Sequence, residues 1–557
     1  MIMEHIRDAN LGFKFTDEQV EVLNKIEDFL YSNDEVFVLS GYAGTGKTSI
    51  MKAVCYFLRE RNKSFNLMAP TGRAALILKN KTGFEASTIH SRIYILDEIN
   101  YKDNKKEIED NKDDLEVSYV FPIKLNDQQK GDVCIVDEAS MVSSVTNKNE
   151  FLKFGTGNLF NDMFTYCRSS LKPGLKLIFV GDPAQLLPVG DTKSAAFDFD
   201  FFRNKGFRVR GASLKMVMRQ SAAGAILRNA TNIRQLLKND RNDRNSLVFD
   251  KSPGEVEDLT GWSVIDTFER LYKEDSEITI VCFSNKKAAT FNRFIRERLF
   301  GTTCLPCKGD RLMVVMNNYN KGLFNGQFVF IENLDDNVIE KRVPVYHGSG
   351  KERKKIIISL HFRKVALRAN GYSLSTYIIE DLLNSFSPAL NFLQVKALYI
   401  LFCMEHSTLK PGSKEFNNAL LCDPFFNAVQ VKYGYAITCH KSQGGEWKNL
   451  IVDYTGRVGL SDDALRWCYT ATTRCSDNLY CICAPDIRPV NVKSVLDAVV
   501  VKKMPEACLS FGQIPATPYH NMDTKPFLRA KYFEIVDKLE YSLQCCRGHF
   551  LSLPRGI

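Results

Sequence analysis

The chain has 557 residues, of which 45% are hydrophobic and 25% are charged. This length allows three or four domains, and the balance is that of folded globular proteins, which excludes a largely disordered chain. The 74 Lys and Arg residues against 65 Asp and Glu give a formal net charge of +9, a modest excess that favours a polyanionic partner.

Neither a signal peptide nor a membrane span is indicated. The segment from Met1 to Asp8 lacks the apolar core of a signal peptide, and no apolar run is long enough to cross a bilayer. We therefore expect an intracellular protein, in the cytoplasm or nucleoid, or in the host cytoplasm if a phage encodes it. The 16 cysteines are then reduced thiols. Cys304 and Cys307 form a lone Cys-x-x-Cys pair, which lacks the further ligands of a structural zinc site.

Apolar, strand-like runs alternate with helical segments in two series along the chain. The first series lies at residues 36–39, 65–69, 133–136 and 175–180. The second lies at residues 278–283, 436–438, 450–452 and 479–483. This alternation is typical of parallel sheets covered by helices on both faces. The sequence therefore predicts an α/β fold with two such sheets.

A glycine-rich loop, Gly41-Tyr-Ala-Gly-Thr-Gly46-Lys47-Thr48, follows the first apolar run and leads into a helical stretch. The backbone N–H groups of such a loop surround a phosphate, and the helix N-terminus adds its positive dipole. Lys47 neutralises the β and γ oxygens, and the Thr48 hydroxyl can hold Mg²⁺. The motif predicts ATP and Mg²⁺ as cofactors. The residues expected to contact the nucleotide here are Gly41, Ala43, Gly44, Thr45, Gly46, Lys47, Thr48 and Ser49.

Polar side chains follow two later runs of the first series. Asp137 and Glu138 come directly after residues 133–136, at the edge where open α/β sheets bind ligands. We expect Asp137 to hold Mg²⁺ and Glu138 to activate the attacking water. Gln185, in the turn after residues 175–180, is placed to sense the γ-phosphate. Alone, these segments would be read as a helix cap and a plain turn; their order after the phosphate loop favours a triphosphatase site.

Together with further motifs, these segments resemble superfamily 1 helicases of the RecD-like and Dda-like branch, which moves 5′ to 3′. The resemblance runs from about Thr16 to about Cys483. No extended signature of the Pif-like relatives follows Met141, so the other branch is favoured. The matching segments are Thr16–Gln19, Ala69–Ala75, Ser87–His90, Asp137–Met141, Gly181–Pro188, Leu214–Gln220, Phe283–Lys286, Gly309–Arg311 with Asn325-Gly326, Tyr435–Glu446 and Tyr469–Arg474.

The resemblance implies two RecA-like P-loop NTPase domains with an inserted hairpin and an inserted small β-rich, SH3-like subdomain. The first motor domain is expected at 1–91 and 131–212, with the hairpin at 92–130. The second motor domain is expected at 213–326 and 431–490, with the SH3-like subdomain at 327–430. A C-terminal extension, 491–557, has no assigned role and contains an amphipathic helix near 525–545.

The resemblance also implies that residues of the second motor domain complete the nucleotide-binding site. Arg219 and Arg474 would reach the γ-phosphate, and an arginine delivered in this way contributes about 10³ to 10⁵ in rate. Hydrolysis would then require that the two halves close on the nucleotide, and each opening and closing becomes a step along a strand. Further nucleotide contacts implied by the resemblance are Gln19, which reads adenine, Gly444 and Glu446.

Residues that hold a nucleic-acid strand without reading its sequence are likewise nominated by the resemblance. They are Pro70, Thr71, Arg73, Thr88, His90, Asn285, Asn325, Thr438, His440 and Lys441. A ring that splits the duplex is expected in the hairpin at Tyr101, Tyr119 or Phe121, although an aromatic packed under a solvated loop explains them equally well. A basic cluster in the SH3-like insertion would suit a phosphate backbone or form a solvated face. Its members are Lys341, Arg342, Lys351, Arg353, Lys354, Lys355, Arg363 and Lys364.

The resemblance thus implies an ATP-dependent DNA helicase that moves 5′ to 3′ on single-stranded DNA and unwinds forks as a monomeric motor. Replication or recombination proteins are the expected partners. Two alternatives remain open at this point. One is a translocase that remodels protein–DNA complexes or acts on RNA, and the other is a nucleotide-gated binding subunit with weak hydrolysis.

Overall fold

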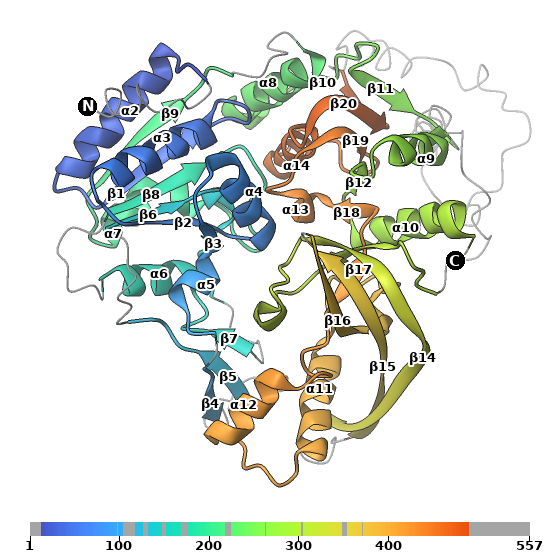
Figure 1. Cartoon of the computed structure of the whole chain (residues 1–557). Helices are drawn as coiled ribbons and strands as arrows, with labels where there is room; N and C mark the ends of the chain where they lie inside the picture. Colours follow the sequence, from blue (N-terminus) through green and yellow to red (C-terminus); the bar gives the residue numbers. More distant parts are fainter. Residues whose placement is uncertain are drawn as a thin grey trace, which may run out of the picture.

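The computed structural model describes residues 13–96, 98–103, 117–125, 132–146, 152–168, 176–217, 224–261, 263–301, 305–347, 354–369 and 371–488. Arg219, Lys351, Arg353, the turn at 348–350 and the helix expected at 525–545 lie outside these ranges. Two α/β lobes lie side by side, and segments inserted into both extend below them in the view of Figure 1. Across the described ranges, no helix is both long and apolar enough to cross a membrane.

Lobe 1 is built on a six-stranded parallel sheet in the order β3-β2-β6-β8-β1-β9. Its strands are β1 Val36–Gly41, β2 Phe65–Ala69, β3 Ala86–Thr88, β6 Val133–Val136, β8 Lys176–Gly181 and β9 Val209–Leu214. Its helices are α2 Asp17–Tyr31, α3 Lys47–Glu60, α4 Gly72–Thr82, α5 Ile89–Ile93, α6 Leu159–Arg168 and α7 Phe199–Asn204. Alternate residues of β1 enter different cores: Phe37 and Leu39 pack against α2 and α3, whereas Val36 and Val38 pack against α6 and α7. Burial on both faces explains the continuous apolar runs.

Lobe 2 contains a five-stranded parallel sheet in the order β11-β20-β19-β12-β18. Its strands are β11 Val256–Leu259, β12 Thr279–Cys282, β18 Ala436–Thr438, β19 Trp447–Asp453 and β20 Cys475–Ile482. Its helices are α8 Ala225–Lys238, α9 Ser263–Glu274, α10 Asn285–Phe300, α13 Cys439–Ser442 and α14 Asp462–Thr472. A small antiparallel pair, β10 Leu247–Val248 and β21 Asp486–Ile487, lies beside it. The prediction of two parallel sheets is confirmed.

An antiparallel sheet, here called the inserted sheet, extends from lobe 2 in the order β16-β15-β14-β13-β17. Its strands are β13 Arg311–Val314, β14 Phe328–His347, β15 Lys354–Ala369, β16 Tyr372–Ile379 and β17 Val431–Tyr433. The expected insertion at 327–430 is therefore too short, because β13 and β17 lie outside it and still belong to this sheet. Leu312 and Val329 of the inserted sheet share one core with Ile280 and Ile451 of lobe 2.

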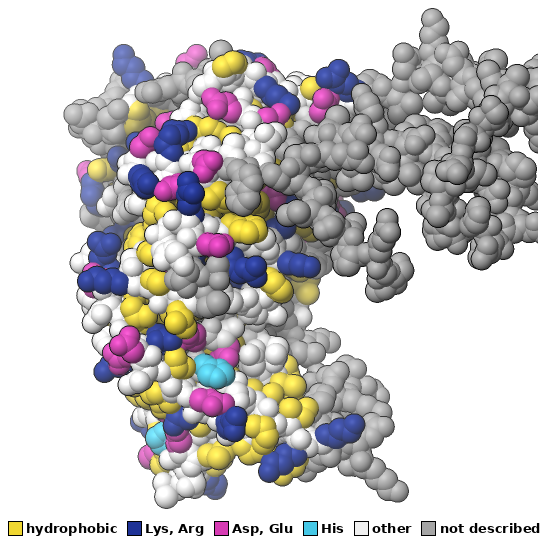
Figure 2. All heavy atoms as spheres, turned by 90° about the vertical axis from the view of Figure 1, so that its right-hand side faces the viewer, with side chains coloured by type: hydrophobic (Ala, Val, Ile, Leu, Met, Phe, Trp, Pro, Cys, Tyr) yellow, Lys and Arg dark blue, Asp and Glu magenta, His cyan; other side chains and the backbone are white. Residues whose placement is uncertain are grey.

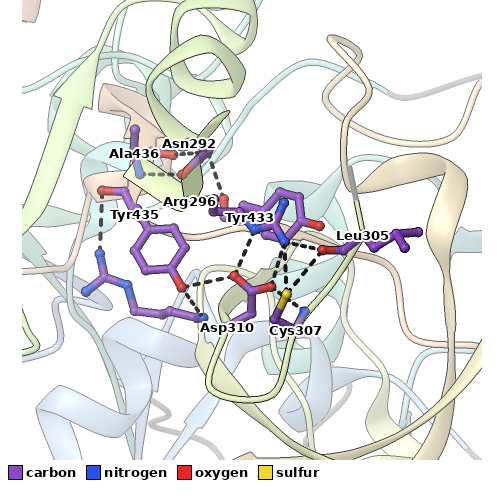
Figure 3. A network of polar contacts seen from close by, with 9 residues as sticks. Asn292, Arg296, Leu305, Cys307, Asp310, Tyr433, Tyr435 and Ala436 are labelled. Carbon is purple, nitrogen blue, oxygen red and sulfur yellow. Dashed lines mark hydrogen bonds and ion pairs between the residues drawn. The ribbon is translucent and has the colours of Figure 1, made fainter. Parts of the chain in front are cut away.

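A buried polar network fixes the inserted sheet to lobe 2 where β13 begins (Figure 3). Arg296 of α10 donates to Asp310 through Nε at 2.9 Å and Nη2 at 3.0 Å, and both side chains are fully buried. The Tyr435 hydroxyl donates to Asp310 at 3.1 Å and accepts from the Arg311 backbone N–H at 2.9 Å. Because a buried ion pair with satisfied partners is costly to break, this network fastens the inserted sheet to lobe 2.

The insertion into lobe 1 forms a three-stranded sheet of β4 Asn100–Asp103, β5 Val117–Phe121 and β7 Leu152–Phe154. It contacts two helices that lie between β16 and β17 in the chain, α11 Phe392–Glu405 and α12 Lys414–Cys422. Tyr119 of β5 stacks on Phe416 at 6.3 Å between ring centroids, and its hydroxyl lies 3.2 Å from that of Tyr399. The Asn417 side chain donates to the Ile99 carbonyl at 2.9 Å. The two insertions therefore bridge the lobes below the sheets (Figure 1).

Two of the three rings expected to split a duplex are buried in this conformation. Tyr119 is enclosed by α11 and α12, and Phe121 is stacked on Phe154 at 4.9 Å between ring centroids. A ring that stacks on the last base pair must be exposed, so Tyr119 and Phe121 serve packing here and that prediction is wrong for them. The side chain of Tyr101 lies outside the described part of the structure.

Half of the described members of the basic cluster are neutralised by carboxylates. Lys341 pairs with Glu405 at 2.8 Å, Arg342 pairs with Glu340 at 2.9 Å, and Arg363 pairs with Glu380 at 2.6 Å, whereas Lys354, Lys355 and Lys364 are exposed. Figure 2 shows dark blue and magenta side chains interspersed over the face that carries the inserted sheet. These ion pairs favour the solvated-face interpretation over a phosphate-binding surface.

Candidate nucleotide cavity and strand groove

A cavity of about 460 Å³ lies between the two lobes, at the carboxyl end of the lobe 1 sheet. Lobe 1 contributes the phosphate loop, the start of α3, part of α4 and the residues after β6 and β8. Lobe 2 contributes Gly444, Gly445, Glu446, Thr473 and Arg474. The predicted nucleotide residues on its wall are Ala43, Gly44, Thr45, Gly46, Lys47, Thr48, Ser49, Asp137, Glu138, Gln185, Gly444, Glu446 and Arg474. The structure thus brings together residues from both halves of the chain.

The phosphate loop joins the end of β1 to the first turn of α3. Gly46 caps α3 in the left-handed region, with φ of 80°, and a Cβ there would lie 2.3 Å from the Gln19 side chain. Only glycine fits this position without strain. The Lys47 ammonium lies above the loop and donates to the carbonyls of Gly41 at 2.8 Å and Tyr42 at 2.9 Å. The lysine is therefore already placed beside the space in which the loop surrounds a phosphate.

Gln19 is placed differently from the expectation that it reads adenine. Its side chain is 3% exposed and does not line the cavity. Its Oε1 accepts from the Thr16 backbone N–H at 3.0 Å, and its Nε2 donates to the Thr45 carbonyl at 3.2 Å. In this conformation Gln19 fastens the phosphate loop to α2, so the expected role is not met. Phe13, which belongs to none of the motifs, lines the cavity, is 39% exposed and offers a ring on which a base can stack.

The two carboxylates after β6 lie in an unusual electrostatic environment. Burial and the neighbouring Glu138 charge raise the pKa of Asp137 to about 7. Glu138 itself has a φ of 48°, a left-handed conformation that costs about 1 to 3 kcal/mol in a non-glycine residue and persists where function requires it. Within the described residues, Glu138 Oε2 and Gln185 Oε1 are buried oxygens without a hydrogen-bond partner. Two such acceptors facing one cavity suit a bound water.

The donor set fits Mg²⁺. No cluster of three or more His, Cys, Asp or Glu side chains suited to a metal occurs in the ranges that the structure describes. Mg²⁺ requires less protein than that, because it keeps waters and is commonly held by one or two protein oxygens together with substrate phosphates. The Thr48 hydroxyl and the Asp137 carboxylate, both on the cavity wall, supply such oxygens. A cation there would also favour the ionised form of Asp137, whose pKa burial raises.

Arg474 reaches the cavity from the end of α14 in lobe 2. Its side chain is 5% exposed, and its guanidinium donates to the carbonyls of Thr470 and Gly445, both at 3.3 Å. Glu446 on the same side forms an ion pair with Lys81 of α4 at 2.9 Å, which joins the lobes across the cavity. The other predicted arginine, Arg219, lies in a part of the chain that the structure does not describe.

Two contacts between the lobes at the phosphate loop were not anticipated. The Tyr469 hydroxyl of α14 donates to Asp182 at 2.6 Å and accepts from the Ala43 backbone N–H at 3.2 Å. The guanidinium of Arg234, from α8, lies 3.8 Å from the ring centroid of Tyr42. Tyr469 opens the motif that ends in Arg474, so the sequence marked it without assigning it a role. Arg234 carries no comparable signal.

A groove runs along the lobes beside the nucleotide cavity. It comprises two cavities of about 250 and 190 Å³, which share Thr71 and Met141. Both lobes line the second of these. Of the predicted strand contacts, Pro70, Thr71, Arg73, His90, Asn325, His440 and Lys441 lie on the groove walls. Thr88 instead caps α5 and is buried, Thr438 is buried at the end of β18, and Asn285 begins α10 outside both cavities.

The charged groups of this groove are few and are held firmly. Arg73 lies between the rings of Trp447 at 4.3 Å and Phe328 at 4.8 Å, and burial lowers its pKa to about 10. Burial and, to a smaller extent, Lys432 lower the pKa of Lys441 to about 8. Its ammonium donates to Asn325 Oδ1 at 2.6 Å. Both side chains are therefore cationic at neutral pH.

The two imidazoles of the groove are neutral at the same pH. Burial lowers the pKa of His90 to about 4. Burial, followed by the charges of Arg457 and Lys441, lowers the pKa of His440. Such rings contribute hydrogen bonds and stacking surface, and the charge that attracts a phosphate comes from Arg73 and Lys441 in the smaller cavity and from Lys153 in the larger one.

Comparison with known proteins places both halves of the cavity in described families. Residues 14–155 match an AAA domain model, and residues 433–482 match a model of the UvrD-like helicase C-terminal domain. An alignment of 493 residues to an uncharacterized protein of Methanocaldococcus jannaschii is 24% identical and covers 82% of this chain and 37% of that protein. The ATP-dependent DNA helicase dda of Enterobacteria phage T4 is 26% identical over 52% of this chain and 58% of its own length.

The RecBCD enzyme subunit RecD of Buchnera aphidicola is 25% identical over 79% of this chain and 68% of its own length. The two matched domain models and these relatives support a superfamily 1 helicase. The chain spans less than two thirds of the length of the archaeal and phage relatives that it matches. Among solved structures it is similar to the Pif1 helicase from Bacteroides in complex with ADP-AlF3 and ssDNA, with a TM-score of 0.41, 17% identity and coverage of 88% and 98% of the two chains.

Proposed function

We propose that this helicase hydrolyses ATP to move 5′ to 3′ along single-stranded DNA and to unwind the duplex ahead of it. The observation that carries the proposal is the cavity walled by the phosphate loop of lobe 1 and by Arg474 of lobe 2, with a second groove also walled by both lobes beside it. A motor needs both features, because one nucleotide cycle must change the distance between two strand-binding surfaces. The name of the phage relative, an ATP-dependent DNA helicase, supports DNA as the substrate. The 5′ to 3′ direction is proposed from the resemblance of the sequence motifs alone.

Each residue on the cavity wall has a role in this proposal. Lys47 neutralises the β and γ oxygens, Glu138 orients and activates the attacking water, and Gln185 senses the γ-phosphate. Arg474 stabilises charge on the γ-phosphate in the transition state. When bound, Mg²⁺ held by Thr48 and Asp137 neutralises phosphate charge. We assign Arg219 the part of a second arginine from its place in the sequence.

Motion follows from the division of these residues between the lobes. Arg474 can complete the site only when lobe 2 closes on lobe 1, and product release allows the lobes to part. Thr71 and Arg73 grip the strand from lobe 1, while His440 and Lys441 grip it from lobe 2. Alternating closure and opening therefore moves one grip relative to the other. Hydroxyl, ammonium and guanidinium donors suit phosphates of any sequence.

The proposed domain assignment differs from the sequence expectation in two respects. We take lobe 1 as the first motor domain, expected at 1–91 and 131–212, but its insertion includes β7 Leu152–Phe154 in addition to residues from 92–130, because β7 pairs with β5. Lobe 2 corresponds to the second motor domain, and its insertion is better taken from Arg311 to Tyr433, since β13 and β17 complete the inserted sheet. Fork DNA and single strands are the proposed ligands of a monomeric motor. Replication or recombination proteins are its proposed partners.

Two forked DNA substrates test the proposal, one with only a 5′ tail and one with only a 3′ tail. We expect unwinding of the 5′-tailed fork in the presence of ATP and Mg²⁺, and ATPase activity that single-stranded DNA stimulates. Unwinding of only the 3′-tailed fork would contradict the direction. Turnover that no strand stimulates would remove the motor proposal and indicate a nucleotide-gated binding subunit. The same ATPase assay with RNA strands decides between the two nucleic acids.

A further inference from the structure

Two loops of lobe 1 connect the nucleotide cavity to the strand groove. The first loop follows β6 and runs from 137 to 145; the second follows β8 and runs from 182 to 191. Near their starts, both loops line the nucleotide cavity, the first with Asp137 and Glu138 and the second with Gln185. Farther along, Met141 of the first and Pro188 of the second line the strand groove. Each loop therefore touches both sites.

The far ends of the two loops are joined through one carboxylate. Asp191 Oδ2 accepts from the Ser143 hydroxyl at 2.6 Å, and Oδ1 accepts from the Ser144 hydroxyl at 2.6 Å and from the Ser144 backbone N–H at 3.3 Å. The Asp191 backbone N–H closes a turn onto the Pro188 carbonyl at 3.1 Å. Hydrogen bonds to an ionised acceptor are about twice as strong as neutral ones. We refer to this arrangement of Asp191, Ser143 and Ser144 as the clasp.

We propose that Asp191 is a positioning residue through which a strand in the groove sets Glu138 and Gln185 for hydrolysis. Asp191 lines neither the nucleotide cavity nor the groove. With the clasp closed, a phosphate or base that pushes on Met141 or Pro188 displaces both loops together. With the clasp open, each loop moves independently. Glu138 and Gln185 then no longer keep a fixed position relative to each other around the attacking water. This inference rests on the proposed function, because it requires strand-stimulated hydrolysis.

The near end of the second loop is held by the other lobe. The Arg466 guanidinium of α14 donates to the carbonyls of Pro183 and, at 3.2 Å, Gln185. Gln185 is therefore fixed to lobe 2 on one side and, through Asp191, to the first loop of lobe 1 on the other. Strand binding, through Asp191, and lobe closure, through Arg466, can therefore both change the position of Gln185, the residue that faces the γ-phosphate.

A second aspartate–serine pair in lobe 1 provides a control that distinguishes the positioning role of Asp191 from a contribution to stability alone. Asp132 precedes β6, at the opposite edge from Glu138, and its Oδ2 accepts from the Ser64 backbone N–H and hydroxyl, both at 2.9 Å. The chemistry of this pair is that of the clasp, yet neither Asp132 nor Ser64 lines a cavity described here. A substitution there tests the loss of an aspartate–serine pair without touching the two loops.

The test compares the full chain with Asp191→Ala and Asp132→Ala. ATP turnover is measured without DNA and with saturating single-stranded DNA, and strand affinity is measured by fluorescence anisotropy with a non-hydrolysable ATP analogue. For Asp191→Ala we expect strand-free turnover within about twofold of wild type and a strand-saturated kcat lower by about tenfold, equivalent to about 1.4 kcal/mol. Strand affinity should stay within about threefold. Asp132→Ala should leave the stimulation ratio unchanged.

The proposal is overturned if Asp191→Ala retains full stimulation, if strand-free and stimulated turnover fall equally, or if Asp132→Ala has the same effect. Ser144→Ala, alone and combined with Asp191→Ala, adds a second readout, since partners in one clasp should show non-additive losses of stimulation. If Asp191→Ala fails to fold, Asp191→Asn and Ser144→Ala provide the same comparison. Wild-type protein without any strand stimulation would remove the proposed function itself, whereas stimulated wild type and stimulated Asp191→Ala would remove only the clasp.

Discussion

Removal of the Tyr469 hydroxyl is the perturbation that probes contact between the lobes most narrowly. Tyr469→Phe deletes the hydrogen bond to Asp182 at 2.6 Å and the one from the Ala43 N–H at 3.2 Å. The Ala43 N–H keeps a second acceptor, because Asp182 Oδ2 lies 3.0 Å from it. The main loss is therefore one hydrogen bond to a carboxylate, which contributes about 1.5 to 3 kcal/mol.

The expected effect on turnover follows from where this contact forms. If it forms as the lobes close on ATP, its full loss would lower kcat by about 10-fold to 150-fold, since 1.36 kcal/mol corresponds to a factor of ten. The ATP KM should remain within about threefold of wild type, because the hydroxyl contacts the backbone of the phosphate loop and not the nucleotide. The assay is steady-state ATP hydrolysis at saturating single-stranded DNA.

Tyr454→Phe is the matched control for this variant. Its hydroxyl is also buried and lies 2.8 Å from Thr472 Oγ1, but both residues belong to lobe 2. We expect Tyr454→Phe to lower thermal stability while leaving kcat within about twofold. The reasoning would be refuted if Tyr469→Phe turned over ATP at the wild-type rate, or if both variants lost the same fraction of kcat.

Three further predictions address the phosphate loop, the groove and the anchor of the inserted sheet. Lys47→Ala should abolish ATP hydrolysis and leave strand affinity in anisotropy titrations largely intact, since the lysine faces phosphate; simultaneous loss of strand binding would contradict the assignment. Because the pKa of Lys441 lies at about 8, its charge is present below pH 8 and lost above it, so strand affinity should fall by up to about tenfold per pH unit above pH 8. Lys441→Arg should flatten this profile, and identical profiles would exclude Lys441 as a phosphate contact. Asp310→Ala leaves Arg296 buried without its partner and should lower the free energy of unfolding in urea by about 3 to 5 kcal/mol; a loss below about 1 kcal/mol would show that the anchor is not rigid.

The parallel sheets and the nucleotide cavity were predictable from the sequence for a physical reason. Strands buried on both faces, such as β1 and β8, must be apolar throughout, so they are visible as continuous runs. Polar residues that follow such runs lie at the same edge of the sheet. This is why Asp137 and Glu138, which follow β6, and Gln185, which follows β8, meet on the wall of one cavity.

Features that depend on contacts distant in the sequence were missed or misread. The sequence left open whether Tyr119 and Phe121 stack on a base pair or pack under a loop, and in the structure α11, α12 and β7 cover them. The limits of the inserted sheet were misplaced because β13 and β17 are short strands that pair with each other across a long stretch of sequence. The motif predicted that Gln19 contacts adenine, yet its side-chain oxygen and nitrogen both form hydrogen bonds to backbone groups. No local pattern indicates such choices.

The same limit applies to the contacts that connect the two sites. Asp191 follows a motif by a few residues and has no periodicity or neighbour that marks it, although it joins two loops. The role of Tyr469 depends on an aspartate in the other lobe. Residues of this kind are found only once segments that are distant in the sequence are placed against each other.

Hydrolysis between two lobes is tested most directly by Arg474→Ala, with kcat measured at saturating single-stranded DNA and ATP affinity measured separately by equilibrium binding. Arg474 lines the cavity from lobe 2 while the phosphate loop lies in lobe 1. The two-lobe mechanism predicts that kcat falls by about 10³-fold or more while ATP affinity changes by less than about threefold. A variant that keeps its turnover, or one whose ATP affinity falls as far as its kcat, would contradict it.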